Sequence, residues 1–198
     1  MTPFAIDDVP GSDEAASSSL RYTRTAILLH WLIAALIIVT IPLGLYSASI
    51  RTTAELPAMT AHKAIGITIL LLTIVRLCWR LGHRVPDLPP MASWIRTVAR
   101  GTHFLFYVLL FAMPLSGWWM SSAFHKHPIT FGLFDVPYLP VAQGISSAIP
   151  AHQVHVTLGW AMIALLGLHV LAALKHHFVD HDQILSRMLG AQTKNRPL

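Results

Sequence analysis

The chain has 198 residues, of which 54% are hydrophobic and only 12% are charged, and its formal net charge is +5. Because soluble domains carry about 25% charged residues, this composition argues against an ordinary soluble protein and predicts a membrane protein. The single cysteine, Cys78, excludes an internal disulfide and an iron–sulfur cluster held by four cysteines.

The two ends of the chain differ from its middle. Residues 1–20 are acidic and rich in serine and alanine, which predicts a disordered tail. They lack the basic start and the short apolar core of a cleavable signal peptide. We therefore expect a disordered cytoplasmic tail at 1–20, one membrane domain at 21–190, and a C-terminal tail at 191–198.

Four apolar segments are long enough to cross a membrane, at about 26–46, 61–81, 102–122 and 152–175. They predict an all-α membrane protein, a four-transmembrane-helix bundle whose core is the natural place for a cofactor. Residues 91–101, with Trp94 and two arginines, fit a helix lying on the membrane surface. The longest loop, 123–151, is rich in proline and apolar residues and is expected to pack over the bundle.

The fourth segment carries two histidines, His155 and His169, which are 14 residues apart. That interval corresponds to roughly 21 Å along a helix and returns to nearly the same face. Imidazole is costly in hydrocarbon and usually functional there. The alternative is that each ring only bonds a neighbouring helix, which becomes less attractive if other helices offer histidines at the same two depths.

Charge predicts the orientation of the bundle. If both termini and the second loop share one side, that side holds eleven of the 14 basic residues. The positive-inside rule then places both termini in the cytoplasm. This topology accounts for the basic composition, so no nucleic-acid partner is needed.

Histidines of different segments can be paired by their expected depth in the membrane. The first and fourth segments place His30 and His169 near the inner surface, and the second and fourth place His62 and His155 near the outer surface. Two imidazoles on facing helices are what six-coordinate haem b requires, so two haems b are predicted, with these four histidines as iron ligands. The chain lacks the Cys-x-x-Cys-His attachment motif, so the haems would be bound without a covalent link.

Three further residues compete for a role at these depths. His152 is the alternative outer ligand, although it lies off the face of His169 and closer to water. His103 is the alternative inner ligand, or lines a quinone site. Arg76 follows His62 by the same 14-residue interval. It either extends to the lipid headgroups or pairs with a haem propionate or an anionic quinol.

Four motifs together resemble the bacterial cytochrome b561 family, including its superoxide oxidase members. They are RYTRTAILLHW, AHKAIGITILLLTIVRLCWRL, HFLFYVLLFAMPLSG and HVTLGWAMIALLGLHVLAALKHHF, and the resemblance covers about residues 20–190. It implies a di-haem b bundle in the bacterial inner membrane, in lipid, with ligands at the same four histidines. It also implies transfer of electrons from periplasmic superoxide to ubiquinone, and it puts His176 near the inner quinone site.

Two functions follow as expectations. The first is a superoxide:ubiquinone oxidoreductase in which no side chain is assigned a catalytic role and Arg51, Lys63 and Lys126 form a local funnel for the anion. The second is the cytochrome b subunit of a hydrogenase or dehydrogenase, which docks a redox partner protein. A purely structural bundle would leave the four depth-matched histidines unexplained.

Overall fold

The computed structural model describes residues 22–50, 56–83, 92–125, 128–131, 134–182 and 184–190. The predicted tails, 1–20 and 191–198, lie outside these ranges. Four long helices dominate the described chain: α2 (Arg24–Ser49), α3 (Pro57–Gly82), α4 (Ser93–Phe124) and α5 (Ile145–Phe178). All four are long and apolar enough to cross a membrane, which confirms the predicted four-helix transmembrane fold.

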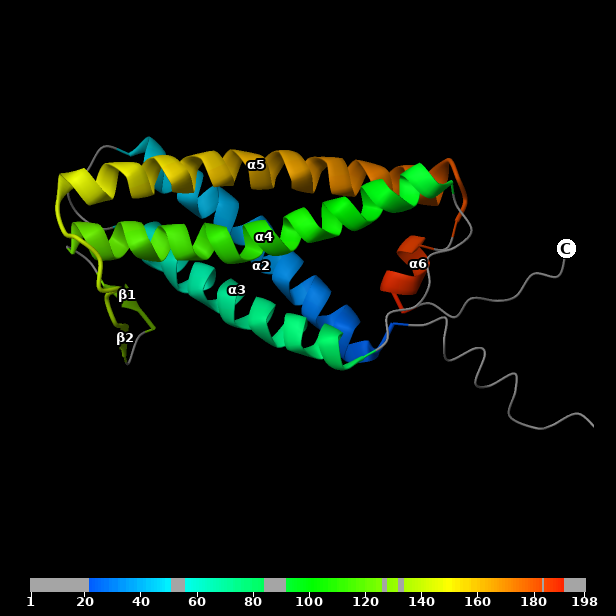
Figure 1. Cartoon of the computed structure of the whole chain (residues 1–198), viewed down its shortest axis with the longest axis horizontal. Helices are drawn as coiled ribbons and strands as arrows, with labels where there is room; N and C mark the ends of the chain where they lie inside the picture. The colour runs from blue at the N-terminus through cyan, green and yellow to red at the C-terminus, as the bar shows by residue number, and fades with distance from the viewer. Residues whose placement is uncertain are drawn as a thin grey trace, which may run out of the picture.

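Successive helices run in opposite directions. Close backbone packing joins α2 to α3, α3 to α4, and α4 to α5. Figure 1 shows α4 and α5 side by side along the long axis, with α2 and α3 crossing them obliquely. The start of α2 and the end of α5 therefore share one end of the bundle, where the short helix α6 (Ile184–Met188) also lies.

The helix α4 is longer than predicted. Residues from Ser93 onward form its first turns, so the expected separate helix on the membrane surface at 91–101 is wrong. The reason is that only Gly101 interrupts this stretch, and one glycine costs a helix about 1 kcal/mol, which does not end it. Trp94 remains 68% exposed near the start of α4.

The helix α5 also begins earlier than predicted, at Ile145, and contains Pro150. Helices in a membrane tolerate proline, because neighbouring helices and local adjustment satisfy the freed backbone groups. The predicted loop 123–151 is therefore shorter. It includes an antiparallel pair of strands, β1 (Ile129–Thr130) and β2 (Asp135–Val136).

This connecting segment packs against the helices, as its apolar residues suggested. Ile129 is only 3% exposed, and β1 contacts α3. The indole Nε1 of Trp118 donates to the Pro137 carbonyl at 2.9 Å, and the Leu139 amide donates to the Ser122 hydroxyl at 3.0 Å. The segment between α4 and α5 is thus tied to one end of the bundle.

The apolar core fills the middle of the bundle. Ile69 lies seven residues after His62, and Met162 lies midway between His155 and His169. Side chains of all four long helices take part, and the buried members of this core are Ile33, Ile37, Ile69, Leu109, Leu110 and Met162. The core therefore separates two levels along the bundle, each of which carries histidines.

Candidate functional site

The first of these levels, here called the His62 level, joins His62 of α3 to His155 of α5. Their ring centroids are 6.0 Å apart, and the ring planes are inclined at 82°. The second, called the His30 level, joins His30 of α2 to His169 of α5, with centroids 6.4 Å apart and planes inclined at 68°. The structure therefore places the four histidines in the same two pairs that depth predicts from the sequence.

Both pairs fit a metal held between two imidazoles. Two metal–nitrogen bonds of about 2 Å each, together with the distance from each nitrogen to its ring centre, separate two such centroids by about 6 Å. The closely packed helix pairs in the described chain do not include α2 with α5 or α3 with α5. The paired imidazoles thus span the wider faces of the bundle, where a flat group such as haem needs room.

At the His62 level, α2 supports the ring of His62. The Nδ1 atom lies 2.9 Å from the backbone carbonyl oxygen of Thr40 and 3.0 Å from its hydroxyl oxygen. Gly44, one turn further along α2, faces the same ring. A Cβ atom at Gly44 would lie 2.7 Å from a ring carbon, which is too close for any side chain.

The helix α4 supports His155 in the same way. The Nδ1 atom of His155 lies 3.0 Å from the Ser116 hydroxyl oxygen. A Cβ atom at Gly117 would lie 3.0 Å from a carbon of the His155 ring. Each histidine of this level is therefore held by a hydroxyl group and seated against a glycine of the neighbouring helix.

Sequence reasoning missed these four supporting residues, Thr40, Gly44, Ser116 and Gly117. A signal for them exists, because hydroxyl groups and glycines inside apolar helices are the residues that allow polar bonds and close approach between helices. They lie at the far end of α2 and of α4, the depth at which His62 and His155 were expected.

The His30 level has a different composition. The ring of His103, on α4, has its centroid 6.2 Å from that of His169, and Phe106 is 5.1 Å from the same ring. Arg76 of α3 interacts electrostatically with the histidines of this level, which are His30, His103 and His169. All four long helices therefore contribute an imidazole or a guanidinium here, and Arg76 has the depth that its spacing predicts.

His176 lies beyond this level, near the end of α5, in an ion-pair cluster. Its Nδ1 atom is 2.7 Å from a carboxylate oxygen of Asp182 and 3.2 Å from one of Asp180. Lys175 donates to both oxygens of Asp180 at 2.7 Å, and this hydrogen bond lowers the pKa of Asp180 below its ordinary value. The sequence analysis singled out His176 but not its two carboxylate partners.

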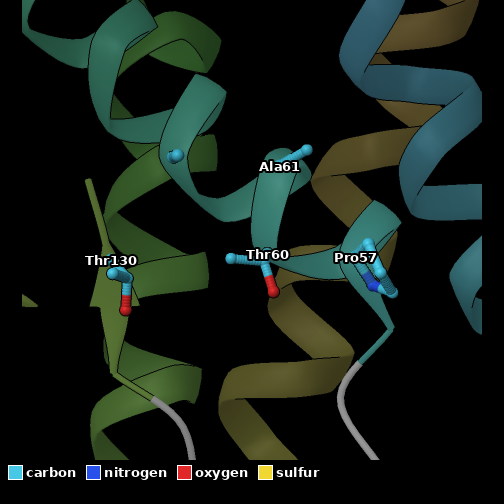
Figure 2. A pocket seen from close by; sticks show the side chains of 5 residues that line it. Pro57, Thr60, Ala61 and Thr130 are labelled. Atoms are coloured by element: carbon cyan, nitrogen blue, oxygen red, sulfur yellow. The ribbon is translucent and has the colours of Figure 1, made fainter. Parts of the chain in front are cut away.

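The opposite end of the bundle has an open recess of about 460 Å³. It is lined by Pro57, Thr60, Ala61 and Ala64 of α3 and by Thr130 of β1. Figure 2 shows the side chains of Thr60 and Thr130 bordering the recess from α3 and β1. Its lining residues of α3 flank His62 in the sequence. The recess is therefore at the end of α3 that carries the His62 level.

The remaining predicted site residues are less central. His152 is exposed, whereas His155 is half-buried, so the structure favours His155 at the His62 level. Lys63 is half-buried beside His62. The other two cations of the expected funnel, Arg51 and Lys126, lie outside the described residues.

Comparison with known proteins agrees with this architecture. Residues 21–191 match the family described as prokaryotic cytochrome b561. The chain is 35% identical over 178 residues to cytochrome b561 homolog 2 of Escherichia coli (strain K12), covering 88% of this chain and 94% of that protein. It is 30% identical over 172 residues to the probable superoxide oxidase CybB of Yersinia pestis, covering 85% and 96%. The chain therefore belongs to the prokaryotic cytochrome b561 family of membrane electron-transfer proteins, which implies a b-type haem.

Proposed function

We propose that the protein is a di-haem b cytochrome that transfers electrons across the bacterial inner membrane, from periplasmic superoxide to ubiquinone. The observation that carries this proposal is the presence of two facing imidazole pairs, at 6.0 and 6.4 Å, at two levels of one apolar bundle. Haem bound at each level supplies one-electron redox chemistry, which the side chains of this chain lack. Similarity to a probable superoxide oxidase supports superoxide as the electron donor.

The net reaction balances without a further reactant. Two superoxide anions each lose one electron and become dioxygen. One ubiquinone gains these two electrons and two protons and becomes ubiquinol. The protein must therefore bind an anion at one end and deliver protons to a quinone at the other.

The end that carries the His62 level is assigned to superoxide. His62 and His155 are the proposed iron ligands there, and Lys63 follows His62 directly. Arg51 and Lys126 complete the proposed funnel, in which positive charge raises the local concentration of an anion. The bias of eleven of the 14 basic residues toward the other end supports a periplasmic position for this one.

The end that carries the His30 level is assigned to the quinone. His30 and His169 are the proposed iron ligands, and Arg76 is the proposed partner of a haem propionate or of an anionic quinol. The Nδ1 atom of His176 lies 2.7 Å from a carboxylate oxygen of Asp182, a contact that favours the protonated imidazole. His176 is therefore the proposed side chain that supplies a proton to the quinone.

The test is a reaction with the purified protein alone. Loaded with haem and given superoxide and a water-soluble ubiquinone, the protein should produce ubiquinol at a rate that depends on its concentration. The variant His62→Ala should abolish this rate, and His152→Ala, which changes an exposed histidine of α5 at the same end of the bundle, should keep it. Quinone reduction that appears only after a hydrogenase or dehydrogenase is added would instead support the electron-transfer subunit.

A further inference from the structure

The hydrogen bonds at the His62 level determine which ring nitrogen carries the proton. The backbone carbonyl of Thr40 can only accept, so the Nδ1 atom of His62, at 2.9 Å, must be the donor. The Ser116 hydroxyl donates its own hydrogen to the Met113 carbonyl at 2.7 Å. Toward His155 Nδ1, at 3.0 Å, Ser116 therefore accepts.

Both imidazoles thus hold their proton on Nδ1 and leave the lone pair of Nε2 free. This is the tautomer in which an imidazole binds a metal through Nε2. Gly44 and Gly117 let each ring approach the neighbouring helix closely enough to form these bonds. Two independent helices, α2 and α4, therefore impose the same state on the two rings.

We propose that Thr40 and Ser116 are positioning residues that fix His62 and His155 as Nε2 ligands and lower the reduction potential of the haem site at the His62 level. This proposal rests on the proposed di-haem function. Donation from Nδ1–H makes an imidazole a more basic ligand, which stabilises the more positive, oxidised metal.

The consequence concerns the haem site at the His62 level. Its reduction potential should be lower with the hydroxyl groups of Thr40 and Ser116 in place than without them. Both levels contain a pair of histidines, but Thr40 and Ser116 contact the rings of the His62 level.

The experiment is a potentiometric titration of the haem-loaded protein, followed by visible and electron paramagnetic resonance spectra. In Ser116→Ala, the midpoint potential of the His62-level component should shift to a more positive value, and its haem should be retained about 10- to 100-fold less tightly. Ser116→Thr should restore both values. Thr40→Val should give a shift of the same sign.

Matched controls remove hydroxyl groups that, among the described residues, bond to the backbone of their own helix. Ser47 of α2 donates to the Leu43 carbonyl at 2.8 Å, and Thr73 of α3 donates to the Ile69 carbonyl at 2.7 Å. Ser47→Ala and Thr73→Val should leave both potentials unchanged. The component of the His62 level is identified in His30→Ala, which should retain that component alone.

Three results would overturn the proposal: no shift in Ser116→Ala, an equal shift of both components, or an equal shift in Ser47→Ala. In each of these cases the wild-type protein would still contain two haems, and the proposed function would stand. A wild-type protein without two haems would contradict the proposed function itself.

Discussion

The two histidine levels have the same pair of ligand candidates but different surroundings. At the His62 level, each imidazole is held through Nδ1 by one neighbouring helix and rests against a glycine. At the His30 level, a third imidazole and a guanidinium gather around the pair. The first environment fixes two rings in one state, and the second brings together imidazole and guanidinium groups that can donate hydrogen bonds.

This difference suggests that the two levels have different functions. An outer-sphere electron donor such as superoxide needs no proton from the protein, and a rigid pair of ligands suffices to receive its electron. A quinone needs two protons and hydrogen-bond donors, which imidazole and guanidinium supply. This argument supports the proposed assignment of the quinone to the His30 level.

The largest expected effect comes from removing a ligand candidate. His62→Ala or His155→Ala should eliminate the haem signal of the His62 level and leave the other, because one imidazole cannot hold a six-coordinate haem. His30→Ala or His169→Ala should do the opposite. Visible spectra of the four purified variants measure this, and loss of the same component from His62→Ala and His30→Ala would contradict the pairing.

A large effect is also expected from His176→Ala. Loss of a positioned proton donor should slow reoxidation of the reduced protein by quinone about 100-fold, while superoxide still reduces it at the normal rate. Stopped-flow spectra separate the two phases. His177→Ala, which changes the adjacent exposed histidine, is the control. Normal reoxidation in His176→Ala would contradict a quinone site at His176 and would move it toward His103.

Arg76→Leu separates two roles of the guanidinium. If Arg76 binds quinone, this variant should keep both haems and slow reoxidation by quinone, with no change in reduction by superoxide. If Arg76 holds a propionate, the haem signal of the His30 level should weaken instead. Haem content and stopped-flow rates, measured together, decide between the two, and an unchanged value of both would exclude Arg76 from this level.

Gly44→Ala should disturb the His62 level and leave the His30 level unchanged. A methyl group there meets the His62 ring at 2.7 Å, so the ring must move, at a cost of about 1–3 kcal/mol for overpacking. The spectrum of the His62 level should change and that of the His30 level should not. Gly66→Ala is the control, because a Cβ atom there meets nothing within 4 Å. A normal spectrum in Gly44→Ala would show that the ring is not held by this contact.

The smallest effect concerns the cluster beyond the His30 level. The hydrogen bond from Lys175 lowers the pKa of Asp180 below 3.8. Because the folded-state pKa is depressed, the contribution of this contact is present above pH 3.8 and is lost as the pH falls through the folded-state pKa. Lys175→Met should therefore raise this pKa, as carboxyl chemical shifts measured during an acid titration would show. An unchanged pKa would mean that Lys175 does not hold Asp180 in solution.

The sequence was sufficient for the helix count and for the pairing of histidines. Both depend on strong and simple signals: long apolar runs, a fixed rise per residue, and the alternating direction of successive helices. Met162 and Ile69 illustrate the value of the fixed rise per residue. Each lies seven residues from a predicted site residue, and each is buried in the core between the two histidine levels.

Other features depend on three-dimensional contacts that the sequence does not express. The continuity of α4 through Gly101 and of α5 through Pro150 depends on the competition between local helix breakers and the surrounding bundle. The support of His62 by Thr40 requires the crossing of α2 and α3 at one particular depth. Asp182 pairs with His176 only because the chain turns back after α5.

The central claim is that one bundle holds two haems at two histidine levels, and the haem content of the purified protein tests it most directly. Pyridine haemochrome analysis, combined with a protein concentration from amino-acid analysis, should give two haems b per chain. A value of one haem per chain, reproduced after haem supplementation during expression, would contradict the two-level account.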